Sequence, residues 1–447
     1  MQTGKHRSVN AYLFRSTIVA ALGGLLFGFD TAVIAGTTRA LSATYHLSPG
    51  LLGFTVASAL WGTVLGSIFA GDPSDRYGRR ACLRALAVLY VVTALGCALA
   101  WNWHSFVCFR LLSGLAIGGS SVIGPMYIAE IAPAAKRGRL VGFFQFNVVS
   151  GILLAYLSNY VVGLMGFGEA EWRWKLGVAA APALLFFVAL FAIPQSPRWL
   201  VRRGALEEAT EVFARIGEPD PGQEVRDILE SIGAEDQQKS EPLFTRKHRL
   251  PIFLAVSIGM FNQLSGINAI LYYLNDIFEK AGFNKVSSDL QAVMIGGTNL
   301  LFTVIAMTII DRVGRRRLLL TGAVGTALCL AGVAVIFATG RNQEMLVWLL
   351  IGFIAFFAVS QGAVIWVYIS EVFPNLVRAK GQSLGSFTHW IMNALISGIF
   401  PLMAASSGAI PFVFFALMMA AYFFIVLFFY PETKGITLEA MQKKLGA

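Results

Sequence analysis

Charged side chains are scarce in this chain. They make up 13% of its 447 residues, against about 25% in typical soluble domains. Hydrophobic residues reach 56% and the mean hydropathy is +0.66, which excludes a soluble protein and indicates one that crosses a membrane many times. The net charge of +10 does not indicate nucleic-acid binding, because the lysines and arginines stand at the ends of apolar segments, as the loop charges of membrane proteins do.

Cysteine is also rare, and its placement excludes two kinds of site. The four cysteines lie within or at the edge of apolar runs, at Cys82, Cys97, Cys108 and Cys329. They have neither the spacing of metal ligands nor that of a disulfide framework, so we expect reduced packing residues, no metal and no cofactor. The sequence contains no nucleophile–base pair that would indicate an enzyme. The first apolar run has no signal-peptide cleavage site.

Long apolar segments dominate the rest of the sequence. A helix that spans a membrane needs about 20 apolar residues, and twelve segments qualify, so we predict an all-α membrane protein with twelve transmembrane helices. A polar stretch over 194–249 interrupts the series. Within it, "EEATEVFARI" and "GQEVRDILESI" have the apolar spacing of short amphipathic helices. The predicted spans are 14–36, 51–71, 82–101, 105–130, 139–163, 174–193, 250–275, 289–310, 317–339, 345–370, 381–404 and 409–430.

Basic residues are concentrated in alternate loops. The loops after spans two, four and eight are rich in arginine and lysine, as is the stretch 194–249. The loops after spans one, three and eleven carry Arg39 alone between them. The positive-inside rule places the basic loops in the cytoplasm. Both termini would then also be cytoplasmic, in a bacterial-type inner membrane.

Three motifs occur twice at nearly constant spacing. "SDRYGRR" returns as "IDRVGRR", "MYIAEIAPAAKRGR" returns as "VYISEVFPNLVRAK", and "PQSPR" after span six is answered by "PETKG" after span twelve. Repeats in register indicate two related six-helix halves, which place a substrate site at the midplane between them. The predicted parts are an N-terminal bundle over 1–193, a cytoplasmic linker over 194–249, a C-terminal bundle over 250–430 and a cytoplasmic tail over 431–447.

Nine motifs, present together and in order, identify a family. They are "GGLLFGFDTAV", "DRYGRR", "RLLSGLAIG", "PMYIAEIAPAAKRGR", "PQSPRWL", "NQLSGINAILYY", "DRVGRR", "WVYISEVFP" and "PETKG". Over nearly its whole length the chain resembles the sugar porter family of the major facilitator superfamily. The resemblance implies the major facilitator fold, and alternating access by rocking of two bundles around a monosaccharide in a central cavity.

The seventh span is unusually rich in amides, in the stretch "FNQLSGINAILYY". These amides cannot share one face of an unbroken helix, so we expect a break at Ser265-Gly266, which is tolerated where backbone lines a wet cavity. Amides donate and accept hydrogen bonds at once, as sugar hydroxyls require, although they could instead join helix to helix. The candidates in this span are Asn262, Gln263, Asn268 and Tyr272, and the resemblance adds Gln145, Asn299, Gly362, Trp366, His389, Trp390 and Asn393.

Some positions depart from the family pattern. Asn262 stands where glutamine is usual, and Gln195 replaces the glutamate of the usual "PESPR". The pair His389 and Trp390 resembles the fructose-type mammalian facilitator, whereas Trp366 is typical of glucose- and xylose-type members. The sequence therefore leaves the identity of the sugar open.

Charged residues near the repeated basic turns predict a cytoplasmic gate. In both halves an acid and an arginine stand seven residues apart close to these turns. Ion pairs between the bundles would hold the outward-facing state and break for inward opening. The resemblance favours this gate, and the alternative is that the basic residues serve topology alone. The candidate gate residues are Asp75, Arg76, Arg79, Glu130, Arg137, Asp311, Arg312, Arg315, Glu371 and Arg378.

Asp30 lies within the first apolar span, where a charged side chain costs on the order of 2.5 to 3.5 kcal/mol. Arg110 is the basic residue deep in the other spans of that half, so we predict a buried pair. If the pair tightens in one state and loosens in another, the proton affinity of Asp30 changes with conformation. The resemblance agrees, because proton-coupled sugar porters have aspartate here and mammalian facilitators have asparagine. A permanent ion pair would instead make the protein a uniporter.

The sequence thus predicts a proton-coupled symporter that imports a neutral hexose or pentose. Its expected partners are the monosaccharide, the proton and the lipid bilayer, and we expect a monomer. A facilitative uniporter is the alternative. A sugar sensor that does not transport is disfavoured, because sensors of this fold carry long cytoplasmic tails and only about 17 residues follow span twelve. An organic-anion exchanger would need several arginines in the cavity, and only Arg110 qualifies.

Overall fold

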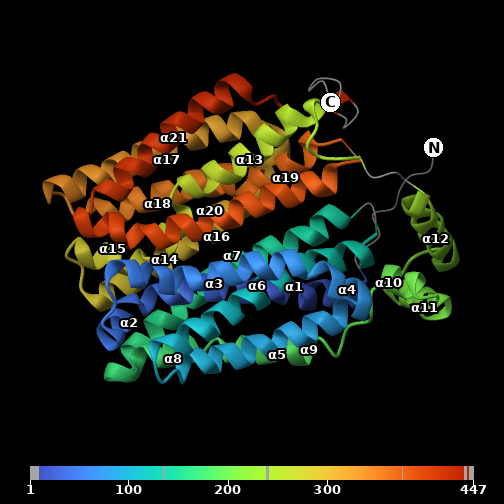
Figure 1. Cartoon of the computed structure of the whole chain (residues 1–447), viewed down its shortest axis with the longest axis horizontal. Helices are drawn as coiled ribbons and strands as arrows, with labels where there is room; N and C mark the ends of the chain where they lie inside the picture. Colours follow the sequence, from blue (N-terminus) through green and yellow to red (C-terminus); the bar gives the residue numbers. More distant parts are fainter. Residues whose placement is uncertain (1–9, 134–135, 238–240, 375, 437–439, 442–447) are drawn as a thin grey trace.

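The computed structural model describes residues 10–133, 136–237, 241–374, 376–436 and 440–441. Within these ranges, twelve helices are long and apolar enough to cross a membrane, as the sequence predicted. In Figure 1 they run side by side along the long axis, with the early helices in blue and teal below the late helices in orange and red. The predictions for the two chain ends concern residues that lie largely outside the described ranges.

The membrane-spanning helices follow the predicted segments. Most are single helices: α1 (Ala11–Val33), α3 (Pro49–Phe69), α5 (Arg79–Ala98), α6 (Trp103–Ile131), α7 (Arg137–Leu164), α16 (Lys285–Val313), α17 (Arg315–Thr339), α20 (Arg378–Ser406) and α21 (Ile410–Phe429). The others are interrupted. They are α8 (Glu171–Gly177) with α9 (Ala180–Ala189), α13 (Arg249–Leu264) with α14 (Ile267–Tyr272), and α18 (Met345–Phe357), which a π-helical turn (Ala358–Gly362) joins to α19 (Ala363–Val372).

Short helices mark the two ends of the bundle (Figure 1). One end, which we call the linker end, carries α4 (Gly71–Tyr77), α10 (Pro197–Arg202), α11 (Leu206–Ile216) and α12 (Pro221–Gln237). The opposite end, which we call the far end, carries α2 (Thr38–Tyr45) and α15 (Leu274–Lys280). Because α11 and α12 cover the two amphipathic segments of the polar stretch, both predicted helices are confirmed.

Local sequence signals explain several helix boundaries. Asn10 caps α1, and its side chain accepts a hydrogen bond from a backbone N–H of the first turn. Asn102 and Ser105 form a capping box at the start of α6. The predicted break in the seventh span is present. Gly266 adopts a φ of 81° between α13 and α14, a left-handed conformation that glycine reaches without steric penalty.

The apolar core is continuous between the two halves at the far end. One cluster of buried side chains includes Val33 and Tyr156 from the first half and Tyr272 and Phe278 from the second. A separate cluster fills the linker end of the first half and extends into the linker, where it includes Phe213. The two halves therefore share one core at the far end, whereas the first half has a core of its own at the linker end.

Asp276 in α15 is a largely buried acid at the far end, in the segment that connects the seventh and eighth membrane-spanning helices. Burial raises its pKa to about 6 from an ordinary 3.8, and Glu279 adds to the rise, while Thr38, Lys280 and Arg39 act in the opposite direction. Unfolding exposes the carboxyl and returns its pKa to the ordinary value. Its contribution to stability is therefore complete below about pH 4 and is lost as the pH rises through 6.

We expect Asp276→Asn to raise the midpoint of thermal unfolding at pH 8, because the amide keeps the shape and carries no buried charge. A pKa of 6 against 3.8 corresponds to at most about 3 kcal/mol. The gain over the parent should shrink below pH 6 and vanish near pH 4, measured on purified protein in detergent. Asp227→Asn, at an exposed position of α12, is the control and should leave the midpoint of thermal unfolding unchanged at every pH. A rise in the unfolding midpoint of Asp276→Asn that does not depend on pH would contradict the raised pKa of Asp276.

Candidate functional site

A cavity of about 130 Å³ lies between the two halves. It is lined from α1 and α7 of the first half and, in the second half, from α13, α14, α16, α18, the π-helical turn, α19 and α20. The side chains around it are amides, hydroxyls, aromatic rings and aliphatic groups. Every predicted sugar-contact residue except Gln263 lines this cavity, namely Gln145, Asn262, Asn268, Tyr272, Asn299, Gly362, Trp366, His389, Trp390 and Asn393.

Gln263 lies behind the cavity wall, where its side chain connects three residues of the lining. Its amide nitrogen donates to Asn262 Oδ1 at 3.0 Å and lies 3.3 Å from both ring nitrogens of His389. Its carbonyl oxygen accepts from Asn268 Nδ2 at 3.0 Å. Gln263 is 1% exposed. In this conformation it therefore positions the cavity amides rather than lining the cavity itself.

Aromatic rings form one wall of the cavity and reach across to the first half. The ring centroids of Trp366 and His389 are 5.1 Å apart, and those of His389 and Trp390 are also 5.1 Å apart. Trp390 in turn packs on Phe27 of α1, with centroids 5.4 Å apart. Indole rings offer a large apolar face with a single polar N–H. Such a wall suits a neutral ligand with an apolar face and polar edges.

Asp30 and Arg110 form the predicted pair inside the first half. Arg110 Nη1 lies 2.9 Å from each carboxylate oxygen of Asp30, and Ser113 donates to Asp30 Oδ1 at 2.9 Å. The side chains of Arg110 and Asp30 are 4% and 14% exposed. Removing one partner of a buried pair strands the other charge and costs about 3 to 5 kcal/mol. The pair is therefore a strong local constraint, and it is accessible from one side.

That accessible side of the pair adjoins the central cavity. A small cavity of about 10 Å³ is lined by both Asp30 and Arg110. Phe27, Thr31 and Tyr272 line this small cavity and also the larger one. Protonation or movement of the Asp30 carboxylate can therefore act on the wall of the central cavity through Tyr272, which lines both cavities.

Sequence reasoning missed several residues at this site. Ser113 follows Arg110 by three positions on α6, so both lie on the same helix face, which is a signal that could have identified it. Thr31 and Phe27 flank Asp30 in the first span, but nothing in their residue types marks them as cavity residues. Their role follows only from the way α1 packs against α14.

The basic turn of the first half is held by an ion pair within that half. Arg79 binds Glu130 through Nε at 3.1 Å and Nη2 at 2.8 Å, and it also pairs with Asp75 at 2.8 Å. Ser196 of the "PQSPR" motif donates to the other oxygen of Glu130. Gln195, the departure from the family pattern, accepts from the backbone N–H of the residue after Arg79 at 3.2 Å.

The second half repeats this arrangement with its own residues. Arg315 binds Glu371 at 2.9 Å and pairs with Asp311 at 2.9 Å. Thr433 of the "PETKG" motif donates to the other oxygen of Glu371. Glu432 accepts from the backbone N–H groups of Arg315 at 2.9 Å and of Arg316 at 3.2 Å, and the second bond corresponds to that of Gln195 in the first half. The repeated motifs therefore form the same three-part contact twice.

These ion pairs lie within each half, whereas the pairs between the two bundles that we expect in the outward-facing state stay a prediction. Each arginine immediately follows the glycine of its turn and lies over the acid in the last turn of a helix of the same half, which explains the pairing. The four remaining gate candidates lie around the two turns. Arg76 stacks on Tyr77, Arg137 lines a cavity with Glu130, the carbonyl of Arg312 accepts from Lys434, and Arg378 donates to the carbonyl of Phe373.

Twelve membrane-spanning helices around a neutral central cavity, with a buried acid–arginine pair beside it, define a membrane transporter rather than an enzyme. The chain belongs to the family described as "Sugar (and other) transporter", whose profile matches residues 16–445. Its two halves and twelve helices are those of the major facilitator fold. The predicted fold class and family are thus confirmed.

Relatives of known activity cover the chain almost completely. A D-xylose-proton symporter of Escherichia coli is 35% identical over 97% of this chain and 96% of its own length. An arabinose-proton symporter of Bacillus subtilis is 36% identical over 95% of this chain and 93% of its own length. The solved inward-open conformation of the xylose transporter from E. coli superposes with a TM-score of 0.87 at 34% identity, covering 97% and 100% of the two chains. These relatives are bacterial, and the twelve apolar helices make this chain a multi-pass protein of the inner membrane.

Proposed function

We propose that this protein imports a neutral hexose or pentose together with a proton, by alternating access. The observation that carries the proposal is the contact between the two cavities. Phe27, Thr31 and Tyr272 line both the central cavity and the small cavity at the Asp30–Arg110 pair. Similarity to D-xylose- and arabinose-proton symporters supports it.

In this proposal the central cavity binds the sugar. Its amides, including Asn262, Asn268 and Asn299, donate to and accept from hydroxyl groups, while Trp366 and Trp390 cover the apolar ring face. Asp, Glu, Lys and Arg are absent from the described residues that line the cavity, which favours a neutral ligand over an anion. Gln145, Tyr272, Gly362, His389 and Asn393 complete the proposed contacts, with Gln263 holding the amides in place.

Asp30 is the proposed proton carrier and Arg110 its conformationally gated partner. The carboxylate is tolerated in the membrane when it is paired with Arg110 or when it is protonated. A conformational change that loosens the pair favours protonation, and one that tightens it favours release. Tyr272 connects this exchange to the sugar, since it touches both cavities.

We further propose that the linker end faces the cytoplasm, as the positive-inside rule predicts. The bundles 1–193 and 250–430 would rock against each other in the lipid bilayer, with 194–249 as a cytoplasmic linker, 431–447 as a cytoplasmic tail, and a monomer as the working unit. The candidate gate residues would then contact the opposite bundle when the linker end closes. Similarity to an inward-open transporter and the shared core at the far end support an inward-facing conformation.

Uptake of radiolabelled xylose, arabinose, glucose, galactose and fructose into proteoliposomes tests the proposal. We expect at least one of them to accumulate above its external concentration when the outside is acidic, and accumulation to stop when a protonophore removes the gradient. Equilibration of the sugar without any proton dependence would favour the uniporter. Competition by sugar phosphates or amino acids, with none by these monosaccharides, would contradict the proposed substrate class.

A further inference from the structure

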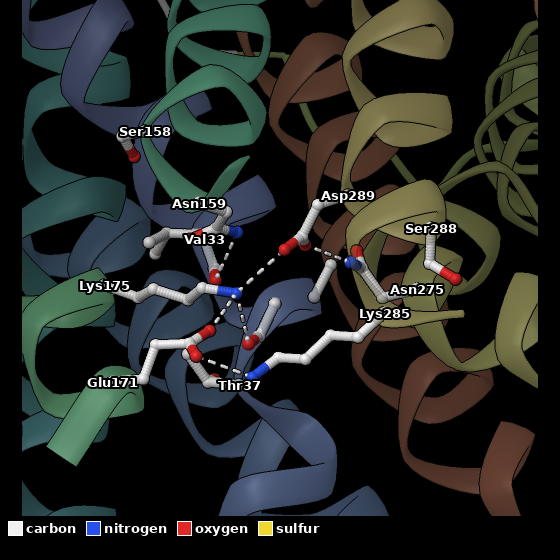
Figure 2. A network of polar contacts seen from close by, with 12 residues as sticks. Val33, Thr37, Ser158, Asn159, Glu171, Lys175, Asn275, Lys285, Ser288 and Asp289 are labelled. Carbon is white, nitrogen blue, oxygen red and sulfur yellow. Dashed lines mark hydrogen bonds and ion pairs between the residues drawn. The ribbon is translucent and has the colours of Figure 1, made fainter. Parts of the chain in front are cut away.

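Four charged side chains meet at the far end of the molecule, away from the cavity and the basic turns. Figure 2 shows Lys175 between two carboxylates, at 2.9 Å from Glu171 Oε1 and 3.2 Å from Asp289 Oδ2. Lys285 binds the other oxygen of Glu171 at 2.6 Å. The side chains of Lys175 and Asp289 are 1% and 2% exposed, that of Glu171 is 10% exposed, and that of Lys285 is 54% exposed.

Two of the three ion pairs in this group, Lys175–Asp289 and Lys285–Glu171, cross from one half of the protein to the other. Glu171 and Lys175 belong to α8 in the first half, whereas Lys285 and Asp289 belong to α16 in the second. Each half supplies one acid and one lysine, so the charges are complementary across the interface and balanced within each half. This is the end at which the two halves share a core, and Arg39 of α2 also pairs there with Glu279 of α15.

The buried charges also have partners within their own half. Lys175 is bound by Glu171 one turn away on α8, and it donates to the carbonyl of Gly36 at 3.2 Å. Asp289 accepts a hydrogen bond from Asn275, which lies in the same half. Separation of the halves would therefore break the contacts of Lys175 with Asp289 and of Lys285 with Glu171, while Lys175 keeps Glu171 and Asp289 keeps its hydrogen bond from Asn275. A buried pair that lacked such partners would be far costlier to open.

From this arrangement we propose that Glu171, Lys175, Lys285 and Asp289 form an ionic latch. The latch holds the far end closed when the linker end is open and releases when the far end opens, so its strength sets the balance between the two conformations. The inference rests on the proposed alternating access for its meaning in transport. The opening of the far end can nevertheless be measured without sugar or proton gradient, so failure of the latch and failure of the symport proposal are distinguishable.

The test exchanges the charges of the pair that is partly exposed. E171K and K285E each place like charges opposite each other at 171 and 285, whereas the double variant E171K/K285E restores opposite charges across the interface, with two lysines in the first half and two acids in the second. Spin labels at Thr44 and Arg341, exposed far-end positions in the first and second halves, report the distance between the halves by electron spin resonance. The four native cysteines are replaced first. E211K, at an exposed ion pair of the linker helix α11, is the matched control.

We expect each single variant to raise the ratio of long to short distances on the order of tenfold, within the usual range of conformational coupling. The double variant should restore the short distance, and E211K should leave the distribution unchanged. Because the side chain of Lys285 is 54% exposed, we expect K285E and K285Q to fold, and their distance distributions can be measured even if E171K does not fold. K285Q should shift the ratio less than K285E, because it removes a charge without introducing one of the opposite sign. Folded single variants without a shift, or a double variant as open as the singles, would overturn the latch.

Discussion

Sugar accumulation against a gradient is expected to disappear when Asp30 is replaced by asparagine. The amide keeps the size of the side chain and can still bind Arg110 and Ser113, which contact the carboxylate at 2.9 Å. It cannot take up or release a proton. Binding of the sugar and exchange of labelled for unlabelled sugar should therefore persist, because both need only the cavity and the conformational change. Two assays in the same vesicles test this: uptake driven by a pH gradient measures accumulation, and counterflow measures exchange.

The control for Asp30→Asn is an acid that lies outside the membrane-spanning helices. Asp72→Asn changes an exposed acid of α4 and should leave accumulation intact. If Asp30→Asn concentrates sugar as the parent does, Asp30 is a structural charge and the proton is carried elsewhere. If the parent shows no proton dependence while it equilibrates the sugar, the protein is a uniporter. Loss of counterflow as well would show that the variant is defective in conformational change rather than in coupling.

The number and position of the helices followed from the sequence because the membrane restricts the solutions. Every backbone group must be satisfied inside the hydrocarbon, so a long apolar run has to be helical. Even the break at Gly266 was predictable, since amides on both sides of it could not share a helix face. The π-helical turn Ala358–Gly362 was not, because "AVSQG" carries no local signal for it. The interruption between α8 and α9 was not predicted either, although Gly177 and Pro182 flank it and a proline disfavours the preceding helical turn.

The residues of the central cavity were identified largely through the family resemblance, and composition alone supported only the amides of the seventh span. Side-chain arrangement was less predictable. Nothing in the sequence distinguishes Gln263, which lies behind the wall, from Asn262, which lines it. The ion pairs of the basic turns proved to lie within each half. Lys175 and Asp289 lie at the edges of the predicted spans 174–193 and 289–310, and the sequence does not mark them as partners, because only tertiary packing brings them together across the interface.

Gln263→Ala should weaken sugar binding roughly tenfold or more. Removal of one partner from a buried hydrogen bond costs about 1 to 3 kcal/mol, and Gln263 contacts Asn262, Asn268 and His389. The loss has two parts. The amide of Asn268 loses its acceptor, and His389 loses a neighbour that holds its ring beside the cavity. The affinity of the purified protein for the transported sugar, measured by calorimetry, gives the size of the effect.

The matched control for Gln263→Ala is Asn147→Ala. Asn147 is also a buried amide, but it donates to the carbonyl of Phe143 on its own helix and does not line the cavity. Its replacement should leave the affinity unchanged, while pH-gradient-driven uptake remains. An affinity equal to that of the parent in Gln263→Ala would show that the cavity amides hold their positions without Gln263. In that case the sugar site depends on the lining residues alone, and the network behind the wall serves the packing of α13 against α20.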